Sequence, residues 1–264
     1  MTSEFVLTSR RTVGVLDIPR VLFAPRGVFG RVEDVPAYAW ALVLLLVSVT
    51  VMGYLLVQTG LIDYEVDQQV QRNIAALELE QLDVVERSAL SDMIADKKKE
   101  GEFLRLINRV QVIGANPMAT LACVLLIPAM FYGLVALTGK KPEWHTLVTI
   151  CVFASFADLM GVIVRFGMRL QFKTLFVDSS LAPLTNFLQS EGASVAQQNA
   201  SLGGLLTAFD PFRIWFWLIM VAGLTVTRQL RGWRAWCACT FFWLSAAAVR
   251  AAIAAGAAQS AASA

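Results

Sequence analysis

Charged side chains inside apolar segments are the residues of this sequence best placed to do chemistry. Asp158 stands near the middle of an apolar run, and Arg165 follows seven residues later. Seven residues are almost two helical turns, so the two side chains lie within roughly 20° of one helix face. Arg250 reaches a similar depth in the last apolar run. An unpaired charge in hydrocarbon costs several kcal/mol, so we expect Asp158 to pair with Arg165 or with Arg250.

Three roles are open for this acid–arginine set. The pair can fix helix packing while Arg165 and Arg250 extend their guanidinium groups toward the outer interface. It can instead line a path for a proton, an ion or a polar substrate. In the third case Asp158 is held in its neutral form.

The sequence contains no familiar catalytic, cofactor-binding or metal-binding motif. There is no Ser/His/Asp set, phosphate loop, dinucleotide fingerprint or HExxH pattern. The single histidine, His145, lies where a loop enters an apolar run, and a zinc site would need partners that are missing. The four cysteines lie in or beside apolar blocks, as small buried hydrophobes do. We therefore expect no enzyme activity, no catalytic residues, no cofactor and no metal.

Composition indicates a lipid environment. Of the 264 residues, 57% are hydrophobic and only 16% are charged, whereas soluble domains carry about a quarter charged residues. The net charge of only +2 argues against nucleic acid as a partner. The apolar residues fall into blocks, so the lipid bilayer is the first expected partner.

Five of these blocks are long enough to cross a hydrocarbon core, which takes about 20 helical residues. Each must be a helix, because lipid cannot satisfy free backbone groups. The sequence thus predicts an all-α integral membrane protein with five transmembrane helices, residues 1–264 forming a single membrane domain. The predicted spans are about 36–57, 117–138, 146–168, 212–229 and 235–255.

Basic residues predict the orientation, since short cytoplasmic flanks are rich in Lys and Arg. Ten of the 22 basic residues lie in the tail 1–35 and in two very short loops, whereas loop 58–116 has seven against eleven acidic residues, and loop 169–211 has few charges. We expect an inner-membrane protein with its N-terminus in the cytoplasm, its C-terminus outside and both long loops outside. The N-terminus lacks a signal-peptide pattern, so we expect it to be retained.

The first outer loop carries two apolar stripes at helical spacing, which indicate amphipathic helices. We expect one long and one short helix, separated by the solvated segment DKKKEGE. They can pack on the protein's own spans or on lipid, or they can present a partner-binding face. The stripes are Val66, Val70, Ile74, Leu77, Val84 and Val85, then Phe103, Leu104, Ile107 and Val110.

A short half-apolar segment precedes the first span. Pro25 suits the first turn of a helix, after which Val28, Phe29 and Val32 gather on one side and Arg26 and Arg31 on the other. This predicts an interfacial helix on the cytoplasmic membrane surface. A specific lipid or protein docking site is the alternative. The predicted anchor residues are Phe23, Pro25, Arg26, Phe29 and Arg31.

Three features together resemble the Yip family, the Ypt/Rab-interacting membrane proteins, in its bacterial branch. The first is the anchor segment followed at once by a span, and the second is the five-span order with a long acidic first outer loop. The third is the stretch LLTAFDPFRIWFWLIMVAGLTVTRQLRGWRA. Its family positions are Asp210, Phe212, Trp215, Gly223 and the basic turn from Arg228 to Arg234.

The resemblance implies a five-span protein with a cytoplasmic N-terminus. Eukaryotic members act in vesicle trafficking through a long cytoplasmic tail, which is reduced here, whereas bacterial members resemble accessory proteins beside transport systems. One departure is that the third span reads VFASFADLM, with Ala157 or Asp158 where the family has a proline. A helix break is therefore in doubt there.

Together these features predict a non-enzymatic inner-membrane scaffold or accessory subunit of a transport or trafficking assembly. Its partner would be another membrane protein or a second copy of the chain. The alternative is a transporter or channel subunit with a polar intramembrane path around Asp158 and Arg165.

Overall fold

The structure, a computed structural model, describes residues 13–36, 38–81, 87–172, 180, 202 and 205–263. Within these ranges every regular element is helical, which confirms the all-α class. The described residues form two compact units. One is built from the chain up to Leu45, from Ala122–Gly161 and from the chain after Val177; the other comprises Leu46–Leu121 and α7 from Val162 onward.

Four helices are long and apolar enough to cross a membrane. These helices agree with the expected spans 36–57, 117–138, 146–168 and 235–255 to within a few residues, except that α7 and α10 extend further at their C-terminal ends. A fifth apolar helix, α9 (Pro211–Val226), has 16 residues and is about 24 Å long, shorter than a hydrocarbon core of about 30 Å. The four are α3 (Ala39–Gln58), α6 (Asn116–Leu137), α7 (Trp144–Phe172) and α10 (Trp233–Ser263).

Helix α7 is the central helix of the first unit. In its apolar window 72% of the residues are buried, against 22% in each of the other three candidate spans. From Thr146 to Ala157 every side chain is buried. The helix runs without interruption past Asp158, so the missing family proline coincides with a continuous helix.

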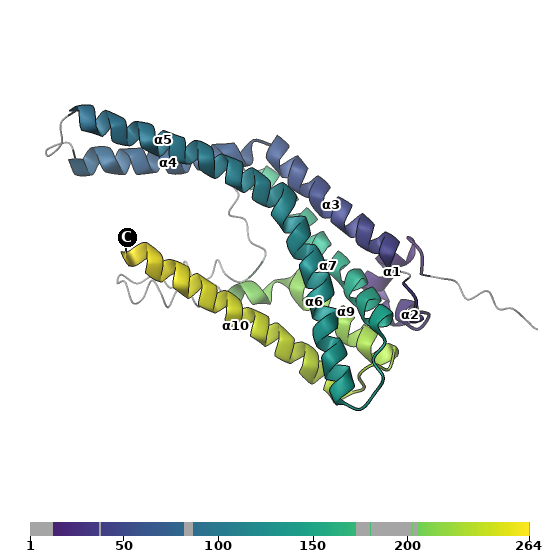
Figure 1. Ribbon diagram of the computed structural model, residues 1–264. Coiled ribbons are helices and arrows are strands. Elements are labelled where there is room, and N and C mark those ends of the chain that lie inside the picture. The colour runs from purple at the N-terminus through teal and green to yellow at the C-terminus, as the bar shows by residue number, and fades with distance from the viewer. Residues whose placement is uncertain are drawn as a thin grey trace, which may run out of the picture. The chain divides into compact units, whose positions relative to one another are not determined.

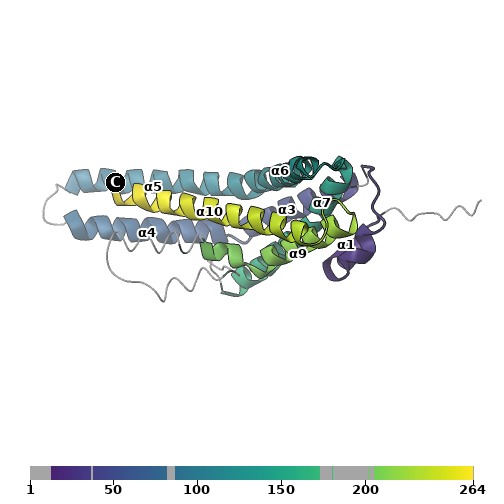
Figure 2. The same cartoon turned by 90° about the horizontal axis from the view of Figure 1, so that it is seen from below.

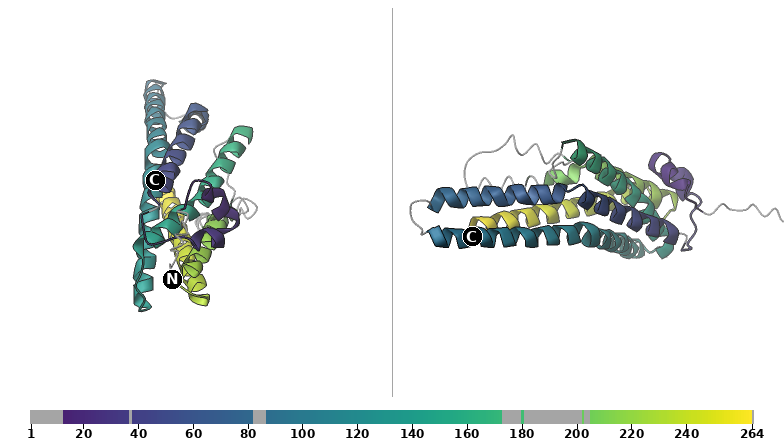
Figure 3. Two further views of the ribbon diagram at one scale, coloured as in Figure 1. Left: turned by 90° about the vertical axis from the view of Figure 1, so that its right-hand side faces the viewer. Right: turned by 90° about the horizontal axis from the view of Figure 1, so that it is seen from above.

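Two short helices precede the first span. They are α1 (Asp17–Phe23), which the sequence did not predict, and α2 (Pro25–Phe29), which starts at the expected proline. Both lie beside the green α9 (Figure 2), as the left-hand view of Figure 3 also shows. In α2, Val28 and Phe29 are buried while Arg26 is exposed. The buried side chains of α2 are thus covered by the protein itself, whereas the interfacial position of this helix stays a prediction.

The second unit contains a helical hairpin. Helix α4 (Leu61–Gln81) and helix α5 (Arg87–Val110) pack side by side (Figure 1). A Cβ added at Gly101 would lie 2.6 Å from Val70 Cγ2, so the glycine permits this close approach. Val66 and Ile74 are buried, which shows that the first stripe packs on the protein's own helices. The Leu77 side chain, Val84 and Val85 lie outside the described residues.

The expected separation of two loop helices at DKKKEGE is wrong. Residues 96–102 lie inside α5, where Lys97 Nζ pairs with Glu100 at 2.7 Å and Lys99 with Asp96 at 3.5 Å. Lysine and glutamate are good helix formers, and pairs at this spacing stabilise a helix. High charge therefore indicates a solvated helix face here and not a break.

Helix α5 continues into α6 through a π-helical segment, η1 (Gln111–Ala115). Gly53 of α3 faces this segment. A Cβ added at Gly53 would lie 2.6 Å from the Val112 carbonyl oxygen. The glycine therefore allows backbone-to-backbone approach of α3 to the π-helical segment.

Candidate functional site

Helix α9 begins at a defined cap. The buried Asp210 is the N-cap residue, and its carboxylate accepts a hydrogen bond from the Phe212 amide at 2.8 Å. Pro211 follows in the first turn, where its missing N–H leaves no donor unsatisfied. The aspartate and proline of the motif therefore fix where α9 starts.

The next motif residues join α9 to its neighbours. A Cβ added at Gly161 of α7 would lie 2.9 Å from Phe212 Cβ, so this glycine lets the two helices meet closely. Trp215 Nε1 donates a hydrogen bond to the Leu22 carbonyl oxygen at 3.0 Å. Its ring also meets that of Phe23 edge-on at 5.9 Å. Phe212 thus contacts α7, and Trp215 binds the end of α1.

Gly223 completes this packing near the other end of α9. A Cβ added there would lie 2.5 Å from Ile150 Cγ2 and 3.2 Å from Phe29 Cε2. Ile150 and Phe29 are 0% and 1% exposed, so neither has room to move. Helices α2, α7 and α9 therefore meet at a position that only glycine fits.

A buried carboxylate holds together the segment that precedes the first span, residues 13–36, here called the entry segment. The Asp17 carboxylate accepts a hydrogen bond from the Gly14 amide at 2.9 Å, and its Oδ1 lies 2.8 Å from Arg31 Nη2 and 3.4 Å from Arg20 Nη1. Burial raises the pKa of Asp17, but the Gly14 hydrogen bond and the Arg31 charge outweigh it, so the pKa is lowered overall. Arg31 thus has a protein partner in addition to any headgroup.

We expect Asp17→Asn to destabilise the entry segment at neutral pH by about 1.5–3 kcal/mol, because it removes charge-assisted hydrogen bonds. A carboxylate whose folded pKa is depressed stabilises above its unfolded pKa of about 3.9 and loses this contribution as pH falls through the folded value. The stability difference between wild type and Asp17→Asn should therefore shrink below about pH 4.

Thermal denaturation in a mild detergent from pH 3 to pH 7 measures this difference. The matched control is Asp96→Asn, because Asp96 and Lys99 are 77% and 78% exposed, and such surface pairs contribute little. A difference between Asp17→Asn and wild type that stayed constant down to pH 3 would contradict the assignment.

Asp158 pairs with an arginine that was not among the sequence candidates. Its Oδ2 lies 3.6 Å from Arg213 Nη1 of α9. Arg250 of α10 is near enough for its charge to interact with those of Asp158, Arg213 and Asp210. Arg165 lies two turns further along α7, in the second unit.

Chemically, this cluster places two guanidinium groups beside two carboxylates on three apolar helices. The opposite charges of the cluster can neutralise one another, which lowers the cost of placing them on apolar helices. Charged side chains of this kind can also line a path for an ion or a polar group. No group of three His, Cys, Asp or Glu side chains suited to a metal occurs in the described part of the chain.

A polar network ties two short loops together. Gln229 Nε2 donates to Glu143 at 2.9 Å, and Lys140 Nζ donates to the Arg228 carbonyl oxygen at 2.9 Å. Asp34 accepts from the amide of His145 at 2.9 Å, and the His145 ring stacks on Tyr38 at 6.0 Å. His145 therefore marks the start of α7, as its position between loop and span suggested.

Comparison with known proteins gives one match. The model of the Yip1 domain matches residues 20–253. This range includes the entry helix α2, the four candidate spans except the end of α10, and all of α9. No curated protein and no solved structure matches the chain.

Proposed function

The chain belongs to the Yip1 domain family, and from this premise we propose that it is a non-enzymatic scaffold or accessory subunit of a membrane transport or trafficking assembly. We place it in the bacterial branch, in the inner membrane, with five spans that include the short α9. In this proposal the N-terminus is cytoplasmic and the C-terminus is outside, in line with the distribution of basic residues.

The observation that carries the proposal is an exposed apolar stripe on the hairpin. Phe103, Leu106 and Val110 of α5 are 62%, 60% and 61% exposed, and Ile107 is 41% exposed. Their spacing of three and four residues puts them on one helix face. The opposite face pairs with α4 through Arg105 with Asp67 and through Arg109 with Asp63 at 2.6 Å.

The ion pairs with α4 support a partner-facing role for this stripe. They link Asp63, two residues into α4, to Arg109, one residue before the end of α5, and so fix which side of α5 faces α4. The stripe points away from these pairs. An amphipathic helix face of this kind fits the apolar groove or helix of another membrane protein.

In-cell photo-crosslinking tests the proposal. A photoreactive phenylalanine analogue replaces Phe103 or Leu106, and the control position is the exposed Lys98 of the same helix. We expect a discrete protein adduct from the first two positions and none from the third. Leu106→Glu should abolish the adduct formed at Phe103, whereas Lys98→Glu should not. An adduct with a second copy would identify the scaffold as self-associating, and adducts with lipid alone would contradict the proposal.

A transporter or channel subunit is the second candidate function. It is favoured by the cluster of Asp158, Arg213 and Arg250, whose charges interact within three apolar helices of one unit. A polar path past Asp158 and on toward Arg165 requires water at this depth. Asp158→Cys, in a chain whose four native cysteines are replaced, should then react with a membrane-impermeant thiol reagent. The buried Ala154, one turn earlier, provides the control cysteine.

A further inference from the structure

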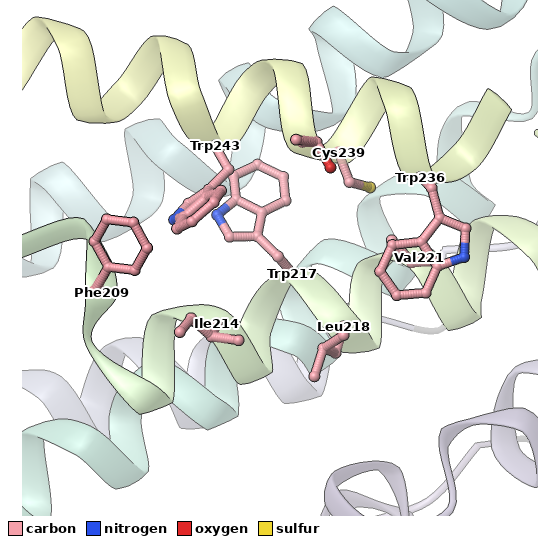
Figure 4. A pocket seen from close by; sticks show the side chains of 9 residues that line it. Phe209, Ile214, Trp217, Leu218, Val221, Trp236, Cys239 and Trp243 are labelled. Carbon is pink, nitrogen blue, oxygen red and sulfur yellow. The ribbon is translucent and has the colours of Figure 1, made fainter. Parts of the chain in front are cut away.

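Helices α9 and α10 enclose an apolar groove. Its volume is about 190 Å³. Trp217 and Trp243 lie between the two helices, with Phe209 at one end and Trp236 at the other (Figure 4). The Phe209 and Trp243 rings meet edge-on at 5.1 Å. The lining carries few polar groups, chiefly Thr240 and the Cys239 thiol.

The shape of the groove suits a hydrocarbon chain. From Trp236 to Trp243 it follows α10 for about 10 Å, roughly a third of the hydrocarbon thickness. Its volume is below the roughly 300 Å³ at which pockets for drug-sized ligands begin. An apolar groove of this length and volume can take part of one acyl chain.

Positive charge gathers at the Trp236 end of the groove. Arg231 and Arg234 lie five and two residues before Trp236, and Arg228 precedes them in the same turn. All three are exposed, and their side chains form no ion pair within the described residues. The sequence has no Asp or Glu from 211 to 264. Glu143, which contacts this turn, already accepts hydrogen bonds from Gln229 and Thr146.

We infer that the α9–α10 groove binds one acyl chain of an anionic glycerophospholipid, whose phosphate is held by Arg231 and Arg234. Guanidinium groups bind phosphate through two parallel hydrogen bonds, which gives geometry as well as charge. Trp236, at this end of the groove, is 54% exposed. Its ring has the amphipathic character of tryptophans at the headgroup level.

Photoactivatable lipids test this inference on the full chain. The chain is reconstituted into phosphatidylcholine vesicles that contain a few per cent of a probe lipid with a diazirine in one acyl chain. The probe is phosphatidylglycerol in one sample and phosphatidylcholine in the other. Adducts are mapped by mass spectrometry. At peptides containing Trp217 and Trp243, we expect the phosphatidylglycerol probe to exceed the phosphatidylcholine probe at least about five-fold, the preference expected for one interfacial arginine.

Two controls separate this site from ordinary boundary lipid. On α3, the exposed Val43, Val47 and Val51 should react equally with both probes. Arg234→Gln should reduce the preference at the groove, and Arg231→Gln/Arg234→Gln should abolish it. Arg26→Gln, which removes one exposed charge from α2, should leave it unchanged. Equal labelling of the groove by both probes, or a preference that survives the double substitution, would overturn the inference.

Discussion

Gly223→Leu is expected to destabilise the chain by about 3 kcal/mol or more. Even the first added carbon would lie 2.5 Å from Ile150 Cγ2, well inside van der Waals contact. Ile150 is part of the fully buried stretch of α7, and Phe29 closes the other side. The structure can accept a leucine only by separating α9 from α7 and α2, so the loss includes contacts beyond the substituted residue.

The matched control is Gly133→Leu. Gly133 lies on α6, and no atom of another segment stands within 4 Å of a Cβ added there. Leucine is a better helix former than glycine by roughly 1 kcal/mol, so this variant should be as stable as wild type or more so. The midpoint of thermal denaturation in a mild detergent compares the two. Equal losses for both variants would contradict the packing seen at Gly223.

A double-mutant cycle shows whether Ile150 causes the loss. Ile150→Ala alone removes buried methyl groups and should cost about 2–5 kcal/mol. In the Gly223→Ala background the same substitution also relieves a contact, so it should cost less. A coupling energy of at least about 0.5 kcal/mol is expected for residues in contact.

Sequence periodicity and composition were sufficient for the long apolar helices. Runs such as residues 39–58 are apolar on all sides, and in lipid only a helix satisfies such a backbone. The stripe of Val66, Val70 and Ile74 likewise predicted one face of α4. Periodicity does not say what that face contacts. The partner turned out to be α5, through the close approach at Gly101.

The motif residues of α9 could be located from the sequence, but their roles could not. Asp210 before a proline is a typical N-cap. Nothing local shows that Trp215 Nε1 reaches the Leu22 carbonyl oxygen, because 193 residues separate them. Long-range hydrogen bonds of this kind leave no periodic signal.

One partner of Asp158, Arg213, was not predicted, although the sequence held a usable signal. Asp158 is fourteen residues from the start of α7 and Arg213 thirteen from the end of α9. At 1.5 Å per residue both lie about 20 Å from the same end of the first unit. Arg213 stands in the first turn of α9, so its contact with Asp158 depends on how α9 packs against α7. Helical periodicity does not predict that packing.

The second large effect is expected at this ion pair. Asp158→Leu should destabilise the chain by about 1–3 kcal/mol, because Arg213 in the first turn of α9 loses a carboxylate partner. Arg213→Leu leaves the Asp158 carboxylate in apolar surroundings and should be similarly harmful. The double substitution Asp158→Leu/Arg213→Leu should recover most of the stability, since it leaves neither charge without its partner and apolar residues can replace an ion pair without loss.

This double variant also separates the two candidate functions. If the pair only fixes the packing of α7 and α9, Asp158→Leu/Arg213→Leu should denature near the wild-type midpoint and keep its adducts from Phe103. If the pair lines a polar path, the double variant should fold and retain its partner, but transport that depends on this protein should stop. A double variant less stable than either single variant would show that the 3.6 Å contact between Asp158 and Arg213 is not a stabilising pair.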